Sequence, residues 1–205
     1  MPDKFLRWYR ARSTRDGFLE QAEFLDRNGI SIRHPTISKG VMLDVDGNGV
    51  NVEPDEMAHL VDLKLASINL EFWISPDASF TCRFSWIPLG LEVQTFYLEG
   101  LSSAEIEHVK SVLIEYMNSF PGTSGYVLDL EGDTAEYDWD VFFDTINMGE
   151  FHPIEMYPSS LVIKGSLVRE RRLFDVPPFV GVRELPGDLI AYSNLFKASN
   201  SSPDG

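Results

Sequence analysis

Residues 68–98 read INLEFWISPDASFTCRFSWIPLGLEVQTFYL and contain three segments rich in β-branched and aromatic residues. We expect strands over 68–75, 80–87 and 93–98, because 75–77 and 88–90 have the composition of turns. The connections are short, so neighbouring strands should be antiparallel. The second strand sorts its side chains by polarity, with Phe80, Cys82, Phe84 and Trp86 on one face and Thr81, Arg83 and Ser85 on the other. One face of the sheet should therefore be core and the other at least partly wet.

A helix over about 103–120 is expected directly after this sheet. Ser102 and Glu105 have the spacing of a capping box, in which a hydroxyl and a carboxylate satisfy two backbone amides at a helix start. An apolar stripe at helical spacing follows, formed by Ile106, Val109, Leu113, Tyr116, Met117 and Phe120. The fold class predicted is α+β, an antiparallel sheet of four or more strands with this helix packed on one face.

The rest of the chain extends this core at both ends. We expect an N-terminal helical segment over 3–28, a hairpin over 41–53 and a short helix from Pro54. A strand over 126–131 and a helix over 133–145 come next, and a C-terminal extension has strand candidates at 161–168 and 188–192. Residues 1–198 are predicted to form a single α+β domain, with a disordered tail over 199–205.

Charge is distributed very unevenly along the chain. The formal net charge is −15, and no lysine or arginine occurs between Lys110 and Lys164. That stretch holds ten carboxylates, namely Glu115, Asp129, Glu131, Asp133, Glu136, Asp138, Asp140, Asp144, Glu150 and Glu155. It also contains Tyr137, Trp139, Phe142 and Phe143, which disordered acidic segments lack. The segment should therefore fold and present an acidic surface.

This charge narrows the classes of partner. Nucleic acid and anionic membranes carry the same sign as the chain, so we expect neither as a partner and expect a basic protein instead. No apolar run approaches the ~20 residues of a membrane span, and residues 1–10 lack the apolar core of a signal peptide. Cys82 is the single cysteine, which excludes an intrachain disulfide. We expect a cytoplasmic protein without cofactors.

The hairpin turn is similar to the first half of a calcium-binding loop. Asp44, Asp46 and Asn48 occupy the positions of the first three oxygen ligands of such a loop, and a glycine follows. Asn51 stands at an apolar position and Asp55, after Pro54, at the position of a bidentate glutamate. The alternatives are a calcium-binding protein using 44–55 and a hairpin with a polar turn.

A metal-dependent enzyme using carboxylates around 129–144 is a further alternative. Asp129, Glu131 and Asp133 alternate, so at least two of them would share one face of a strand and could hold a divalent ion. The other interpretation is the solvated face of an edge strand. The chain contains no G-x-S-x-G, P-loop or G-x-G-x-x-G motif, and we expect no catalytic residues.

The favoured hypothesis is a protein-binding module whose acidic face neutralises a basic partner. Immunity and antitoxin proteins, which inhibit toxins such as cationic nucleases, have these properties. Protein interfaces concentrate aromatic residues at the centre and charges at the rim. The expected partner-binding residues are Asp129, Glu131, Asp133, Glu136, Tyr137, Asp138, Trp139, Asp140, Phe143 and Asp144. Trp139 has two possible places, an interface anchor or a core residue packed between the sheet and the C-terminal extension.

Overall fold

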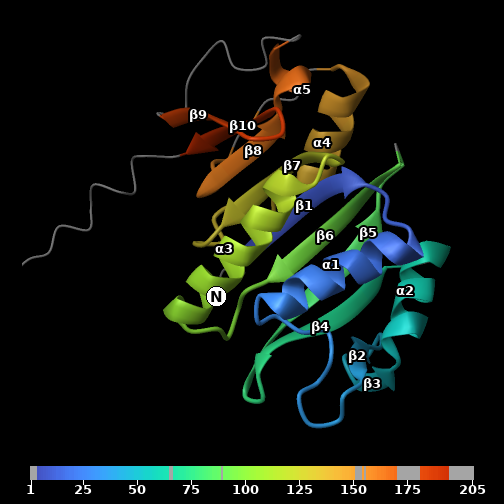
Figure 1. Cartoon of the computed structure of the whole chain (residues 1–205). Coiled ribbons are helices and arrows are strands. Elements are labelled where there is room, and N and C mark those ends of the chain that lie inside the picture. Colours follow the sequence, from blue (N-terminus) through green and yellow to red (C-terminus); the bar gives the residue numbers. More distant parts are fainter. Residues whose placement is uncertain are drawn as a thin grey trace, which may run out of the picture.

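The computed structural model describes residues 4–64, 67–88, 90–150, 154, 156–169 and 181–193. Ten strands form one sheet in the order β3-β2-β4-β5-β6-β1-β7-β8-β10-β9, with every neighbouring pair antiparallel (Figure 1). The strands are β1 (Phe5–Ala11), β2 (Gly40–Leu43), β3 (Gly49–Val52), β4 (Ile68–Ser75), β5 (Ala78–Trp86), β6 (Leu91–Tyr97), β7 (Thr123–Asp129), β8 (Ser160–Lys164), β9 (Gly181–Leu185) and β10 (Leu189–Ser193). The helices are α1 (Arg15–Arg27), α2 (Pro54–Leu63), α3 (Ser103–Ser119), α4 (Trp139–Met148) and α5 (Gly165–Arg169). The predicted α+β class is confirmed.

The N-terminal strand β1 lies in the interior of the sheet, between β6 and β7. Phe5 is opposite Tyr97 of β6 on one side and opposite Asp129 of β7 on the other. The expectation of helix over 3–28 was wrong for residues 5–11, and the N-terminal helix begins at Arg15. The reason is burial on both faces, since a strand covered on both sides has apolar residues at consecutive positions and resembles a buried helix.

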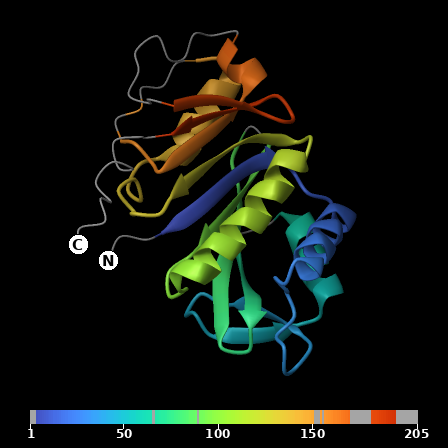
Figure 2. The ribbon, with the colours of Figure 1, turned by 60° about the vertical axis from the view of Figure 1, so that its left-hand side comes forward.

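The first face of the sheet is covered by α1, α2 and α3. Figures 1 and 2 show α1 and α3 side by side on this face. The capping box of α3 is present, with Glu105 N donating to Ser102 Oγ and Ser102 N donating to Glu105 Oε2 at 2.7 Å. The core on this side includes Leu6, Trp8, Phe18, Leu25, Met57, Leu70, Phe72, Cys82, Phe84, Phe96, Val109, Leu113 and Met117. The helix predicted over 103–120 is therefore confirmed, and its stripe faces the sheet.

A second core lies on the opposite face, under α4. It contains Phe5, Tyr9, Val127, Trp139, Phe142, Phe143, Ile146, Leu161, Ile163, Ile190 and Tyr192. These residues come from α4 and from β1, β7, β8 and β10, so α4 covers this half of the face. On the same face β4 and β5 present Glu71, Thr81 and Arg83, which are exposed or half-buried. The expected division of the sheet into core and wet sides holds in the β4–β5 region.

A buried polar network joins α1 to β1 and β6 within the first core. The Arg10 guanidinium donates to Gln21 Oε1 at 2.9 Å and lies 4.0 Å from Glu92. Glu92 also accepts hydrogen bonds from the amide and hydroxyl of Ser13, each at 2.9 Å. Gln94 donates to both Gln21 and Glu92. Because the buried charges are paired and hydrogen-bonded, the network fixes α1 on the sheet without an unsatisfied ion.

Most of the remaining expected elements are present with shifted bounds. The hairpin is β2–β3, the short helix is α2, and the strand at 188–192 is β10. The strand expected over 126–131 is β7 and ends at Asp129. The segment 161–168 is a strand only to Lys164, because α5 begins at Gly165. The predicted tail over 199–205 lies outside the described residues.

Candidate partner-binding site

The buried carboxylate of Asp129 fixes the connection from β7 to α4, residues 130–138, through hydrogen bonds to its backbone. Asp129 Oδ1 accepts from the amides of Glu131 and Gly132, at 3.1 and 2.9 Å. Its Oδ2 accepts from the amide and hydroxyl of Thr134, at 2.7 and 2.8 Å. Trp139 Nε1 donates to the same Thr134 hydroxyl at 3.2 Å. Both carboxylate oxygens are thus engaged in fixing the loop backbone, and Asp129 contributes no surface to a partner.

The helix expected over 133–145 begins only at Trp139. Asp138 is the N-cap, and its side chain accepts from Val141 N at 3.0 Å. Trp139, Phe142, Phe143 and Ile146 then form the buried stripe at spacings of three and four residues. Val141 is 45% exposed and lies outside this stripe, and Tyr137 precedes the helix. An Asp N-cap before this stripe was the signal in the sequence that would have located the helix.

Trp139 and Phe143 are core residues. Both are fully buried, and Phe143 stacks on Tyr9 of β1 with ring centroids 3.8 Å apart. Trp139 packs edge-on against Phe142 at 5.5 Å and lies 4.6 Å from the half-buried Tyr137 ring. Of the two places considered for Trp139, the structure gives the core, so neither Trp139 nor Phe143 can act as a surface anchor.

The first turn of α4 is tied to the middle of the sheet. Tyr9 Oη donates to Asp140 Oδ1 at 2.7 Å, and the Arg7 guanidinium lies 3.7 Å from the same oxygen. Arg7 also donates to Thr95 Oγ1 at 3.1 Å. Burial raises the pKa of Tyr9 well above its ordinary value, so this phenol stays protonated and donates. Asp140 therefore positions α4 and is already paired.

Four of the expected partner-binding residues are exposed, and all four belong to the connection 130–138. Glu131, Asp133, Glu136 and Asp138 are exposed, whereas Tyr137, Asp140 and Asp144 are half-buried. Within the described part of the chain, no lysine or arginine forms an ion pair with Glu131, Glu136 or Asp138. We refer to Glu131, Asp133, Glu136 and Asp138 as the acidic loop. At Glu131, Glu136 and Asp138 it combines carboxylates that have no ion pair among the described residues with a backbone that is fixed in advance.

A cavity of about 280 Å³ adjoins the acidic loop. It lies where β1 begins and where β6 and β7 end, and sequence analysis did not detect it because its walls come from three distant segments. Its lining residues are Lys4, Leu98, Glu99, Gly100, Leu101, Leu130 and Glu131. Glu131 thus belongs both to the acidic loop and to the cavity.

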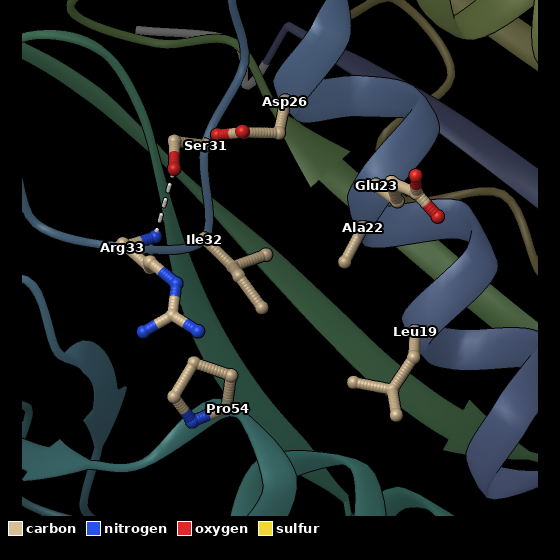
Figure 3. Close-up of a pocket in the computed structure, with 8 residues that line it drawn as sticks. All are labelled: Leu19, Ala22, Glu23, Asp26, Ser31, Ile32, Arg33 and Pro54. Atoms are coloured by element: carbon tan, nitrogen blue, oxygen red, sulfur yellow. Dashed lines mark hydrogen bonds between the residues drawn. The ribbon is translucent and has the colours of Figure 1, made fainter.

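A second cavity, of about 230 Å³, lies beside α1. Figure 3 shows Leu19 and Ala22 of α1 pointing toward Ile32 and Pro54, and Asp26 pointing toward Ser31. The Arg33 amide donates to Ser31 Oγ at 3.1 Å, and its guanidinium donates to the carbonyl of Ser38. None of its lining residues was a sequence candidate, and none belongs to the acidic loop.

The hairpin with the calcium-like sequence closes on itself through Asp44. Asp44 Oδ1 accepts from the amides of Asp46 and Asn48, at 2.9 and 2.8 Å. Hydrogen bonds from Asn48 hold the pKa of this exposed carboxyl below its ordinary value. Within the described ranges, no three or more His, Cys, Asp or Glu side chains are grouped so as to hold a metal ion. This applies to the carboxylates at 129–144 as well as to Asp44 and Asp46.

Comparison with protein-family models, with characterised proteins and with solved structures gave no match. No helix among the described residues is both long enough and apolar enough to cross a membrane.

Proposed function

We propose that this chain is an acidic binding module that neutralises a basic protein through the acidic loop, in the manner of an immunity or antitoxin protein. One observation carries the proposal. Exposed carboxylates surround a loop whose backbone is held by the buried Asp129, and Glu131, Glu136 and Asp138 have no ion-pair partner among the described residues.

The physical basis is complementary charge on a surface that needs little reorganisation. A net charge of −15 attracts a cationic protein over a distance and accelerates encounter. A loop fixed before binding loses little conformational freedom when the partner docks. Nuclease toxins fit this requirement, because an enzyme that contacts phosphates carries a basic surface that carboxylates can cover.

The test is capture of partners from the native cell extract at ~20 mM and ~300 mM salt, followed by mass-spectrometric identification. The loop variant carries Glu131→Gln, Glu136→Gln and Asp138→Asn, and asparagine preserves the N-cap of α4. A control variant with the same change in net charge carries Glu20→Gln, Glu23→Gln and Glu115→Gln, which are exposed residues of α1 and α3.

We expect a basic partner that is captured at low salt, is reduced at high salt and is lost with the loop variant but retained by the control variant. If the partner is a nuclease, the native chain should inhibit it and the loop variant should inhibit it less. Equal capture by the loop and control variants would mean that the acidic loop is not the interface.

A further inference from the structure

The cavity beside the acidic loop has an apolar floor and a charged rim. Leu98 is fully buried at the floor, and Leu101 and Leu130 are half-buried beside it. Glu99, Glu131 and Lys4 are exposed at the rim. A side chain with an aliphatic stem and a charged head fits this combination, because the stem covers apolar surface while the head stays at the rim.

The walls of the cavity are fixed by hydrogen bonds to the sheet. Leu98 N donates to the carbonyl of Lys4 at 2.9 Å, which holds the segment after β6 against the segment before β1. Leu130 N donates to Ser159 Oγ at 3.0 Å, and Glu131 N donates to Asp129. A partner would therefore meet a cavity that is formed before binding. Its volume of about 280 Å³ lies below the ~300–1,000 Å³ of pockets for drug-sized ligands and suits one side chain.

We propose that this cavity receives an arginine side chain of the basic partner, with the guanidinium between Glu99 and Glu131. This inference rests on the proposed function, since Glu131 links the cavity to the acidic loop. Arginine is favoured over lysine because its guanidinium is more weakly hydrated and matches carboxylates with paired donors. The rim holds two carboxylates and one ammonium, so its net charge is negative and favours a cation.

A substitution of Lys4 tests whether the group bound in the cavity is positively or negatively charged. An arginine head in this cavity is repelled by the Lys4 ammonium, so Lys4→Ala should strengthen binding. A carboxylate in the same place would be attracted by Lys4, and Lys4→Ala would then weaken binding. Glu131→Gln should act in the opposite direction to Lys4→Ala in both cases.

The probe is the tripeptide N-acetyl-Gly-Arg-Gly-amide, titrated into the full chain at ~20 mM salt while the leucine methyl signals are followed by NMR. The neutral control peptide carries citrulline in place of arginine, which preserves shape and removes charge. We expect saturable shifts at Leu98, Leu101 and Leu130 with the arginine peptide alone. Glu131→Gln should weaken binding by about threefold, as for a partly exposed ion pair, and Lys4→Ala should strengthen it. Glu115→Gln, on α3 and outside the cavity, should leave the affinity unchanged.

Equal shifts with the citrulline peptide, or weaker binding by Lys4→Ala, would overturn the assignment of an arginine. The double variant Glu136→Gln with Asp138→Asn separates this inference from the proposed function, because neither residue lines the cavity. If that variant loses the captured partner while the native chain does not bind the arginine peptide, the arginine pocket alone is refuted. If the peptide binds but partner capture does not depend on the acidic loop, the link between the pocket and a basic partner is refuted.

Discussion

Asp129 is the residue on which the geometry of the candidate site depends most. It was expected as a partner-binding residue, but it is buried at the end of β7 and accepts four hydrogen bonds. The Asp129 carboxylate accepts hydrogen bonds from the backbone amides of the loop and so fixes the backbone that carries Glu131 and Asp133. Its effect on binding is therefore indirect, through the conformation of the loop. Its negative charge is therefore structural, although it belongs to the most acidic part of the sequence.

Asp129→Ala should destabilise the protein by on the order of 3 kcal/mol. The change removes two acceptor oxygens and the four hydrogen bonds that they accept, and it leaves the amides of Gly132 and Thr134 buried without partners. The free energy of unfolding from urea titration measures the effect. Glu131→Ala, whose side chain is exposed, should stay within about 0.5 kcal/mol of the native value. Equal values for the two variants would show that the loop is not held by Asp129.

The location of Trp139 illustrates what residue types can predict at this scale. Aromatic residues among carboxylates are compatible with an interface and with a core, and composition does not separate the two. The packing of α4 on the sheet decides for the core, because Trp139, Phe142, Phe143 and Ile146 form the face of the helix that is buried there. The helix begins at Trp139, six residues later than expected, so Tyr137 lies before it.

Among the elements, α3 is the one whose sequence pattern was sufficient. A capping box and a stripe at helical spacing identify both its start and its buried face. β1 is the opposite case. Its residues Phe5, Leu6, Trp8, Tyr9 and Arg10 are all buried, so neither of its faces shows the polar alternation that identifies a strand. Only its tertiary neighbours β6 and β7 explain its conformation.

Leu113→Ala should reduce the free energy of unfolding by about 2–5 kcal/mol, because Leu113 is buried in the middle of α3 and its truncation leaves a cavity against the sheet. Chemical denaturation measures this directly. Glu107→Ala is the control on the same helix. It removes only an exposed ion pair with Lys110 and should cost less than about 1 kcal/mol. Similar losses in both variants would contradict the assigned orientation of α3.

We expect the protein to lose stability in alkaline solution, because a tyrosine on β7 and another on β10 are buried in their neutral form. Burial raises the pKa of Tyr126 to about 12 and that of Tyr192 to about 12, from an ordinary value near ~10. The folded state thus favours the neutral phenols, and their contribution is fully present below about pH 10 and is lost as the pH rises toward 12. Urea unfolding at intervals from pH 8 to pH 11.5 should give a falling free energy above pH 10. The double variant Tyr126→Phe with Tyr192→Phe should fall less steeply, and identical slopes would contradict the assignment.

At the scale of the whole molecule, like charge opposes folding. With a formal net charge of −15, repulsion among surface carboxylates raises the free energy of the compact state. Salt between ~10 mM and ~150 mM shortens the Debye length from about 30 to about 8 Å and screens this repulsion. The melting temperature should therefore rise with salt, by about 2–4 °C for each kcal/mol of relief.

Thermal unfolding monitored by circular dichroism at several NaCl concentrations measures this rise. The control variant Glu20→Gln, Glu23→Gln and Glu115→Gln carries three fewer negative charges and should show a smaller salt response. A melting temperature that is constant or falls with salt would mean that attractive ion pairs outweigh the repulsion.

The interior place of β1 has a consequence for the order of folding. β1 is synthesised before both of its neighbours and must pair with residues 91–97 on one side and with residues 123–129 on the other. During synthesis one hydrogen-bonding edge of β1 stays open until residues 91–97 have been made, and the other until residues 123–129 have been made. Pairings between such distant segments are slow to form, and a strand edge that has not yet paired is a site of aggregation. The time between the appearance of residue 5 and that of residue 129 is thus the interval in which the nascent chain is most exposed to misassembly.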